Sequence, residues 1–198
     1  KKVVWIFLDG SSSMAIGTSV ENAFEYAVQA VSSLAQFYLA RNCYVGFCVY
    51  NSGRLLLPDV GRKQEYRITK EILDLDVSTT NEPLKKAVKK CRGYLLGMNP
   101  YSIIITIVRK ENLKELVDGI KELRKYTVGY ISSPIIILHI MGHSIVAQDF
   151  YEYVGAKLLE MKNQPAIRAL RRAGAFVIPW DPRRQSLTTL MFLGMKGR

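Results

Sequence analysis

The 198-residue sequence predicts an α/β fold with three layers, built on a doubly wound, mostly parallel sheet with one antiparallel edge strand. Short apolar runs alternate with segments whose apolar residues recur at helical spacing, as expected when parallel strands are covered by helices on both faces. Nearly half of the residues are apolar, which supplies a substantial core. No linker interrupts the pattern, so we expect a single domain over residues 1–198.

The expected strands are separated by clear turn and loop residues. They cover Val3 to Leu8, Tyr44 to Tyr50, Arg54 to Leu57, Ser102 to Val108, Pro134 to Ile140 and Phe176 to Pro179. The Asn51-Ser52-Gly53 turn returns the third strand antiparallel at an edge, and Pro58 is expected to end it. Right-handed crossovers between the other strands make the sheet Rossmann-like.

Helical segments are expected between these strands. They cover Glu21 to Leu39, Gln64 to Leu73, Pro83 to Leu96, Leu113 to Leu123, Gln148 to Met161 and Pro165 to Arg172, with a last segment near Leu187. Pro83 suits the first turn of its helix, where a backbone N–H is not needed.

The sequence is basic, with 28 Lys and Arg against 17 Asp and Glu and a net charge of +11. A field of this sign favours acidic partners, an anionic surface or nucleic acid. The basic residues are spread over several expected helices, and no groove of interleaved aromatic residues can be traced for nucleic acid. A basic nucleic-acid or anionic-surface binding domain therefore stays open as an alternative but is not preferred.

Cysteine content and hydropathy indicate the compartment. Cys43, Cys48 and Cys91 have no metal-ligand spacing and are typical of free thiols in a reducing environment. No apolar stretch approaches the roughly 20 residues of a membrane-spanning helix. We therefore expect a cytoplasmic domain with no membrane contact of its own. The chain begins without Met, directly before a strand, so we expect a fragment whose parent chain could be anchored through another part.

The loop after the first strand, Asp9-Gly10-Ser11-Ser12-Ser13, carries the most specific pattern in the sequence. In an open α/β sheet, ligands bind beyond the carboxyl ends of the strands, where this loop lies. Asp9, Ser11 and Ser13 can turn carboxylate and hydroxyl oxygens toward one point, and such oxygens are ligands suited to Mg²⁺ or Mn²⁺. The glycine patterns of dinucleotide sites and of P-loops are both absent.

With Met14 behind it, this loop matches the D-x-S-x-S motif, and the sequence resembles the von Willebrand factor type A (vWA) domain. In that family the motif begins a metal-ion-dependent adhesion site. Two further stretches extend the resemblance: Tyr44-Val45-Gly46-Phe47 is similar to the second strand of the family, and Ser78-Thr79-Thr80-Asn81 to its threonine loop.

The resemblance implies a set of metal ligands. Ser11 and Ser13 would bind Mg²⁺ or Mn²⁺ directly, and Asp9 would bind it directly or through water. A threonine would complete the set, for which the family pattern selects Thr80, with Thr79 as the alternative.

One stretch departs from the family pattern. The family ends its fourth strand with Thr-Asp, which supplies a second carboxylate, whereas this sequence reads Ile105-Thr106-Ile107-Val108, followed by Arg109-Lys110. Loss of one supporting carboxylate can cost about 10–100-fold in metal affinity. We therefore expect a degenerate site near Ile107, and whether it holds an ion is left open.

The end of the sequence suggests a subgroup. Gly174-Ala175 and Trp180-Asp181-Pro182 resemble the end of prokaryotic vWA proteins that are associated with MoxR-type AAA+ ATPases. The resemblance implies a protein-recognition module, not an enzyme, that acts with such an ATPase in the assembly or maturation of protein complexes. An acidic residue of the partner protein would complete the metal coordination.

A phosphotransferase or hydrolase that uses Asp9 stays open as a further alternative. Haloacid-dehalogenase-like enzymes need a second Asp where this chain has Ser11, and a serine hydrolase needs a G-x-S-x-G elbow that is absent. Of the two histidines, we expect His139, within a strand, to be a core or strand-edge residue and His143, in the loop that follows, to lie on the surface. We expect Asp181 to form a turn after the last strand.

Overall fold

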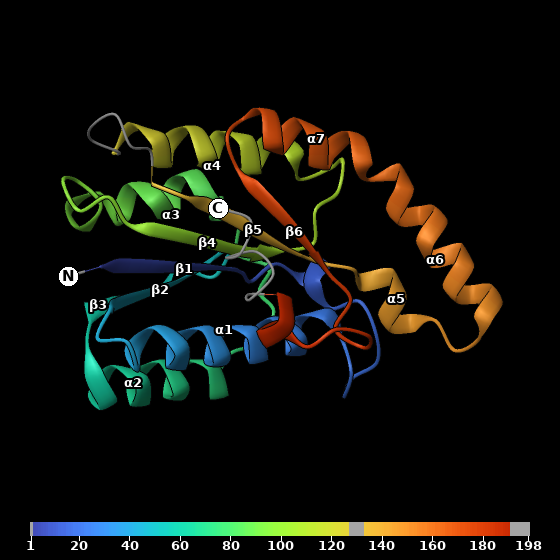
Figure 1. The fold of residues 1–198 in the computed structure, drawn as a ribbon, viewed down its shortest axis with the longest axis horizontal. Helices are drawn as coiled ribbons and strands as arrows, with labels where there is room; N and C mark the ends of the chain where they lie inside the picture. Colours follow the sequence, from blue (N-terminus) through green and yellow to red (C-terminus); the bar gives the residue numbers. More distant parts are fainter. Residues whose placement is uncertain (1, 127–132, 191–198) are drawn as a thin grey trace.

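The computed structural model describes residues 2–126 and 133–190, and a six-stranded sheet forms its middle layer (Figure 1). The strand order is β3-β2-β1-β4-β5-β6. The strands are β1 (Val3–Asp9), β2 (Tyr44–Tyr50), β3 (Arg54–Asp59), β4 (Tyr101–Thr106), β5 (Ile135–Ile140) and β6 (Phe176–Trp180). β3 pairs antiparallel with β2, and the other neighbouring strands pair in parallel. The predicted fold class is thereby confirmed.

Helices cover both faces of the sheet. They are α1 (Ala23–Leu39), α2 (Gly61–Leu73), α3 (Leu84–Lys90), α4 (Leu113–Lys125), α5 (Gly142–Val146), α6 (Phe150–Lys162) and α7 (Gln164–Arg172). Figure 1 shows α1 and α2 on one face, α3, α4 and α7 on the other, and α6 running outward beyond the sheet edge. Within the described ranges, no helix combines the length and the apolar character that crossing a membrane requires.

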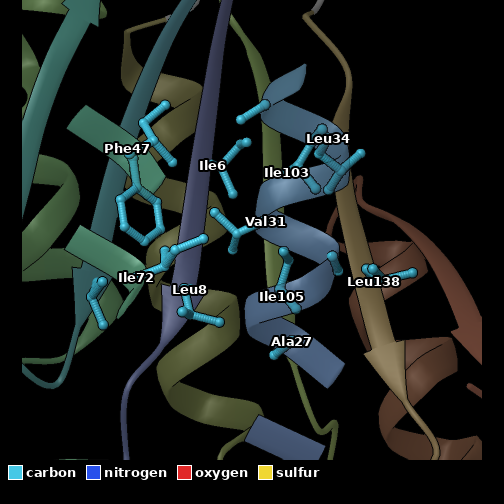
Figure 2. Close-up of a cluster of buried hydrophobic side chains, with 14 of the residues drawn as sticks. Ile6, Leu8, Ala27, Val31, Leu34, Phe47, Ile72, Ile103, Ile105 and Leu138 are labelled. Atoms are coloured by element: carbon cyan, nitrogen blue, oxygen red, sulfur yellow. The ribbon is translucent and has the colours of Figure 1, made fainter. Parts of the chain in front are cut away.

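The central strand β1 is buried on both sides, which explains its continuous apolar sequence. Ile6 and Leu8 face α1, where they pack among side chains such as Val31 (Figure 2). Trp5 and Phe7 face the opposite layer and join a second core cluster. Burying each such side chain contributes about 1.5–3 kcal/mol, so β1 is fixed firmly at the centre of the sheet.

Two strand ends differ from the prediction. β3 continues through Pro58 to Asp59, because an edge strand needs no ladder N–H on its outer side and its pairing with β2 shifts register between Val45 and Phe47. β4 ends at Thr106 rather than Val108. The Val108 N–H donates instead to His139 Nδ1 (2.9 Å), so this part of the chain leaves the ladder.

Two helical predictions also need correction. Pro83 lies at the N-cap of α3 rather than within it, and α3 ends at Lys90, followed by a 3-10 turn over Arg92–Tyr94. The short helix α5 lies between β5 and α6, where the sequence analysis placed no helix, and it contains His143. Residues 187–190 are helical, as expected near Leu187.

His139 is a fully buried residue of β5, as predicted, and it anchors α6. Because its Nδ1 accepts from Val108 N–H, the ring carries its proton on Nε2 and donates to Glu160 Oε2 at 2.9 Å. Glu160 and Ala156 are the buried residues of α6. A polar contact thus joins this outlying helix to the sheet.

Candidate metal and partner site at the carboxyl edge of the sheet

Asp9, the last residue of β1, is buried at the carboxyl edge of the sheet. Its Oδ1 accepts from Ser11 N–H (2.9 Å) and from Asn51 Nδ2 (3.4 Å), and its Oδ2 accepts from Thr106 Oγ1 (2.7 Å). Hydrogen bonds to a carboxylate are among the strong ones in proteins. The Asp9 side chain is therefore fixed in one orientation.

The serine loop begins in close contact with β2, and this close approach requires glycine at residue 10. A Cβ atom there would lie 2.7 Å from Val49 Cγ1 and 3.1 Å from the Tyr50 carbonyl oxygen, so a larger residue would push the loop off β2. A 3-10 turn over Ser12–Met14 follows. It brings the Ser11 and Ser13 hydroxyl oxygens to 2.7 Å from each other.

The threonine loop lies directly beside the serine loop. Ser78 N–H donates to the Gly10 carbonyl oxygen (2.7 Å), and Ser78 forms an isolated parallel bridge with Ser11. Ser78 Oγ accepts from Thr80 N–H at 3.0 Å, which shapes the turn that carries both threonines. Thr79 and Thr80 are both exposed, so the choice between them as a ligand stays a prediction.

These loops enclose a pocket of about 410 Å³. Its lining includes all five residues predicted as ligands or alternative ligands: Asp9, Ser11, Ser13, Thr79 and Thr80. The five residues were predicted to lie at one edge of the sheet, and they line one cavity there. Their role as metal ligands stays a prediction.

Ile107 lies away from this pocket, in the core cluster on the α1 face, with 2% of its surface exposed. The position that carries an acidic residue in the vWA family pattern therefore supplies no carboxylate here. The next residue but one, Arg109, lines the pocket and brings a positive charge to its rim.

The sequence did not point to several residues that line the pocket, and two of them contact each other beside Asp9. Asn51, after β2, and Glu115, in the first turn of α4, both line the pocket, and Asn51 Nδ2 lies 3.4 Å from Asp9 Oδ1 and 3.3 Å from Glu115 Oε1. Each of them follows a strand that lies beside β1. Because the carboxyl ends of parallel strands meet at the same edge of the sheet, polar residues after these strands are candidates for the Asp9 site. Glu115 thus brings a carboxylate into the pocket from a helix, and Glu111 also lines the pocket.

The negative charge of Asp9 affects its neighbours. Burial raises the pKa of Glu115, and the charge of Asp9 raises it further. Burial likewise raises the pKa of the Tyr50 phenol, with Asp9 as the next contribution. The Asp9 side of the pocket is therefore an environment that favours a cation.

The donor atoms suit a small, hard cation. Adjacent ligands of an octahedral Mg²⁺ with bonds of about 2.0–2.1 Å lie about 2.9 Å apart, close to the 2.7 Å between the Ser11 and Ser13 hydroxyl oxygens. In the described part of the chain, no three His, Cys, Asp or Glu side chains gather as a metal cluster. A site at Asp9 would therefore depend on hydroxyl ligands.

Solved structures share this architecture. The SpRpn10 VWA domain superposes with a TM-score of 0.54 at 16% identity, over 96% of this chain and 93% of that domain. The chain has the vWA fold. The conserved hypothetical protein BatB from Bacteroides thetaiotaomicron gives a TM-score of 0.61 at 14% identity, over 99% of this chain and 97% of its own.

Part of a larger protein is also similar to this chain in structure. The human COPII-coat protein Sec24c gives a TM-score of 0.50 at 9% identity, over 98% of this chain but 32% of its own. No protein-family model and no curated protein matches the sequence. At such low identities the similarity establishes the vWA fold and leaves the function to be argued from the pocket.

Proposed function

We propose that this chain is a protein-recognition module whose Asp9 pocket binds Mg²⁺ or Mn²⁺ and, through it, an acidic residue of a partner protein. One observation carries the proposal: Asp9, Ser11, Ser13 and the threonine loop lie around one pocket at the carboxyl edge of a vWA fold. This edge is where ligands of open α/β sheets bind.

Ser11, Ser13 and Thr80 would hold the ion, with Asp9 directly or through water and Thr79 as the alternative threonine. The bound cation would supply an electrophilic centre for a carboxylate from outside. Arg109 at the rim favours the same carboxylate, whereas Glu115 supports the cation in place of the acid missing at residue 107.

The pocket offers little support for hydrolysis by Asp9. Both of its carboxylate oxygens accept hydrogen bonds, and its orientation is fixed by groups from three strand ends. Among the described residues that line the pocket, no histidine is present as a general base. Recognition is the function that these contacts favour.

The partner in our proposal is a MoxR-type AAA+ ATPase, with which the domain would act in the cytoplasm during assembly or maturation of protein complexes. This step rests on the sequence resemblance at Gly174-Ala175 and Trp180-Asp181-Pro182. Co-purification of the two proteins in Mg²⁺, lost in EDTA and in Ser11→Ala, is the expected result. Equal recovery in all three conditions would contradict a metal-dependent contact.

The metal proposal predicts that Mg²⁺ or Mn²⁺ raises the Tm of the wild type but not of Ser11→Ala. An ion at about 100 times its Kd stabilises a protein by about 2.7 kcal/mol, because it binds the folded state alone. Differential scanning fluorimetry measures the shift.

Ser12→Ala is the matched control, because Ser12 lines the same pocket but lies outside the D-x-S-x-S positions. It should respond to the ions as the wild type does. A wild type that shows no shift with either ion at millimolar concentration would rule out the metal site.

A further inference from the structure

A second pocket, of about 540 Å³, lies at the carboxyl end of β6. It is formed by the segment after β6, by α5 and by the beginning of α6. Asp181 and Ser144 are the two residues of its lining that are almost fully buried, each with 3% of its surface exposed. This pocket shares no lining residue with the Asp9 pocket.

The side chains of Asp181 and Ser144 lack internal partners. Both carboxylate oxygens of Asp181 and the hydroxyl of Ser144 are buried without a hydrogen bond in the described structure. The turn predicted at Asp181 is formed by its backbone, whose carbonyl oxygen accepts from Arg184 N–H and Gln185 N–H. The side chain is not needed for that turn, and burying a carboxylate without a partner destabilises the folded state.

The charged residues around this pocket are engaged elsewhere. Arg183 donates to both carboxylate oxygens of Glu21 (2.9 and 3.1 Å) and to the Ala147 carbonyl oxygen (2.8 Å). The Arg184 guanidinium stacks over the Tyr153 ring at 3.7 Å from its centre. Asp149 accepts from Glu152 N–H as the N-cap of α6. Among the described residues, none of these groups forms a hydrogen bond with the Asp181 carboxylate.

The pocket continues into an exposed apolar face of α6. Phe150 lines the pocket and is 72% exposed, and Val154, Leu158 and Met161 follow it at helical spacing with 41%, 57% and 65% of their surfaces exposed. Side chains three and four residues apart share one face of a helix. A continuous apolar face of this kind is typical of protein contact surfaces.

We propose that this pocket and the Phe150–Met161 face of α6 bind a protein segment that carries a lysine or arginine next to apolar side chains. The cationic group would donate hydrogen bonds to the Asp181 carboxylate and the Ser144 hydroxyl oxygen, which can accept them and have no hydrogen-bond partner in the described structure. The apolar side chains would lie along α6. Charge complementarity at Asp181 selects a basic residue, and the adjoining apolar face selects a protein over a small amine.

The test uses the whole chain, stripped of metal by dialysis against EDTA and then transferred to chelator-free buffer without Mg²⁺ or Mn²⁺, so that its outcome does not depend on an ion in the Asp9 site. The first probe is a 16-residue helical peptide with leucines every three to four residues and one terminal lysine. The second is the same peptide with norleucine in place of lysine. Butylammonium chloride and calcium chloride are the small-cation probes. Fluorescence anisotropy and Tm shifts measure binding to the wild type, Asp181→Asn and Asp149→Asn.

The lysine peptide should bind the wild type at least about 10-fold more tightly than the norleucine peptide. Asp181→Asn should abolish that difference, and Asp149→Asn, at the rim of the same pocket, should preserve it. Without any probe, Asp181→Asn should have a Tm equal to or above that of the wild type, because it removes an uncompensated charge. Leu158→Ser should weaken both peptides.

Three outcomes would overturn the proposal. A clear drop in Tm for Asp181→Asn, with unchanged peptide binding, would make the carboxylate a structural group. Equal affinity for the lysine and norleucine peptides would remove the charge recognition. A shift of Tm by butylammonium or calcium that depends on Asp181, without peptide binding, would make the pocket a small-cation site.

Discussion

The Asp9 carboxylate receives hydrogen bonds from residues at the ends of three adjacent strands. Ser11 follows β1, Asn51 follows β2 and Thr106 ends β4. The strand order β2-β1-β4 places these ends side by side. The orientation of one acidic side chain thus depends on the register of half the sheet.

Thr106→Val tests this arrangement. The substitution keeps the shape of the side chain but leaves Asp9 Oδ2 without its 2.7 Å donor. Because hydrogen bonds to charged groups contribute about 1.5–3 kcal/mol, we expect a loss of that order in the free energy of unfolding. Urea titration measures it.

Thr79→Val provides the matched control for Thr106→Val, since Thr79 lines the same pocket but is exposed. It should change stability by less than about 0.5 kcal/mol, as surface substitutions usually do. Similar values for the two variants would show that the Thr106 hydroxyl does not support Asp9.

At the scale of elements, a buried polar contact joins α6 to the sheet. Much of its apolar surface is exposed, and the buried His139–Glu160 pair joins it to β5. Its position therefore depends on a polar contact more than on burial of an apolar stripe.

The substitution Glu160→Ala should weaken the attachment of α6 to the sheet. The Nε2–H of His139 would lose its buried acceptor, at a cost of about 1–3 kcal/mol, and we expect faster amide hydrogen exchange across Phe150–Lys162. Hydrogen exchange with mass spectrometry measures the change. Glu160→Gln retains an acceptor and should exchange nearly as the wild type does. Unchanged exchange in Glu160→Ala would mean that other contacts hold the helix.

The N-terminal end of α1 is joined to the segment after β6 through Glu21. Hydrogen bonds from Arg183 and then from the Tyr26 hydroxyl lower the pKa of Glu21 to about 2, from an ordinary value of 4.5. A depressed carboxyl pKa stabilises the folded state above pH 4.5, and this stabilisation is lost as the pH falls toward 2.

Glu21→Gln should therefore lower the Tm at pH 7 and leave it nearly unchanged at pH 2. Thermal melts of the wild type and the variant between pH 7 and pH 2 check this, with the difference expected to close below about pH 4.5. Glu25→Gln, on the exposed side of the same helix end, is the control. A difference in Tm that persists at pH 2 would show that charge does not cause it.

The helices and strands could be predicted from the sequence because each carries a local pattern. The continuous apolar run of β1 and the spacing of Ala27, Val31 and Leu34 in α1 follow from burial alone. The serine and threonine loops were likewise found from their oxygen-bearing residues. Non-local contacts were not accessible: Asn51 and Glu115 meet across 64 residues, and β4 ends early because His139, 31 residues beyond Val108, takes a backbone N–H.

At the scale of the whole molecule, the net charge of +11 supports binding to anions other than the proposed protein partner. α3 carries Lys85, Lys86 and Lys89 in exposed positions, which gives this face of the molecule a positive field. Such a field attracts nucleic acid without any dedicated groove.

We therefore expect binding to duplex DNA that is weak and steeply dependent on salt. Affinity should fall by orders of magnitude between about 50 and about 200 mM salt, as it does for binding by counterion release alone. Fluorescence anisotropy with a labelled duplex measures it, with Lys85→Glu/Lys86→Glu as the comparison. Tight binding that survives at the higher salt and is lost in that variant would favour the nucleic-acid alternative.

The strand order has a consequence for affinity. Asp9 ends β1 and Asp181 follows β6, three strand spacings away along the same edge, which at about 4.8 Å per spacing is about 14 Å. One rigid partner could touch both pockets at once, presenting an acidic group to one and a basic group to the other. The second contact would then form at high effective concentration, so two weak contacts could together give a tight and bivalent complex.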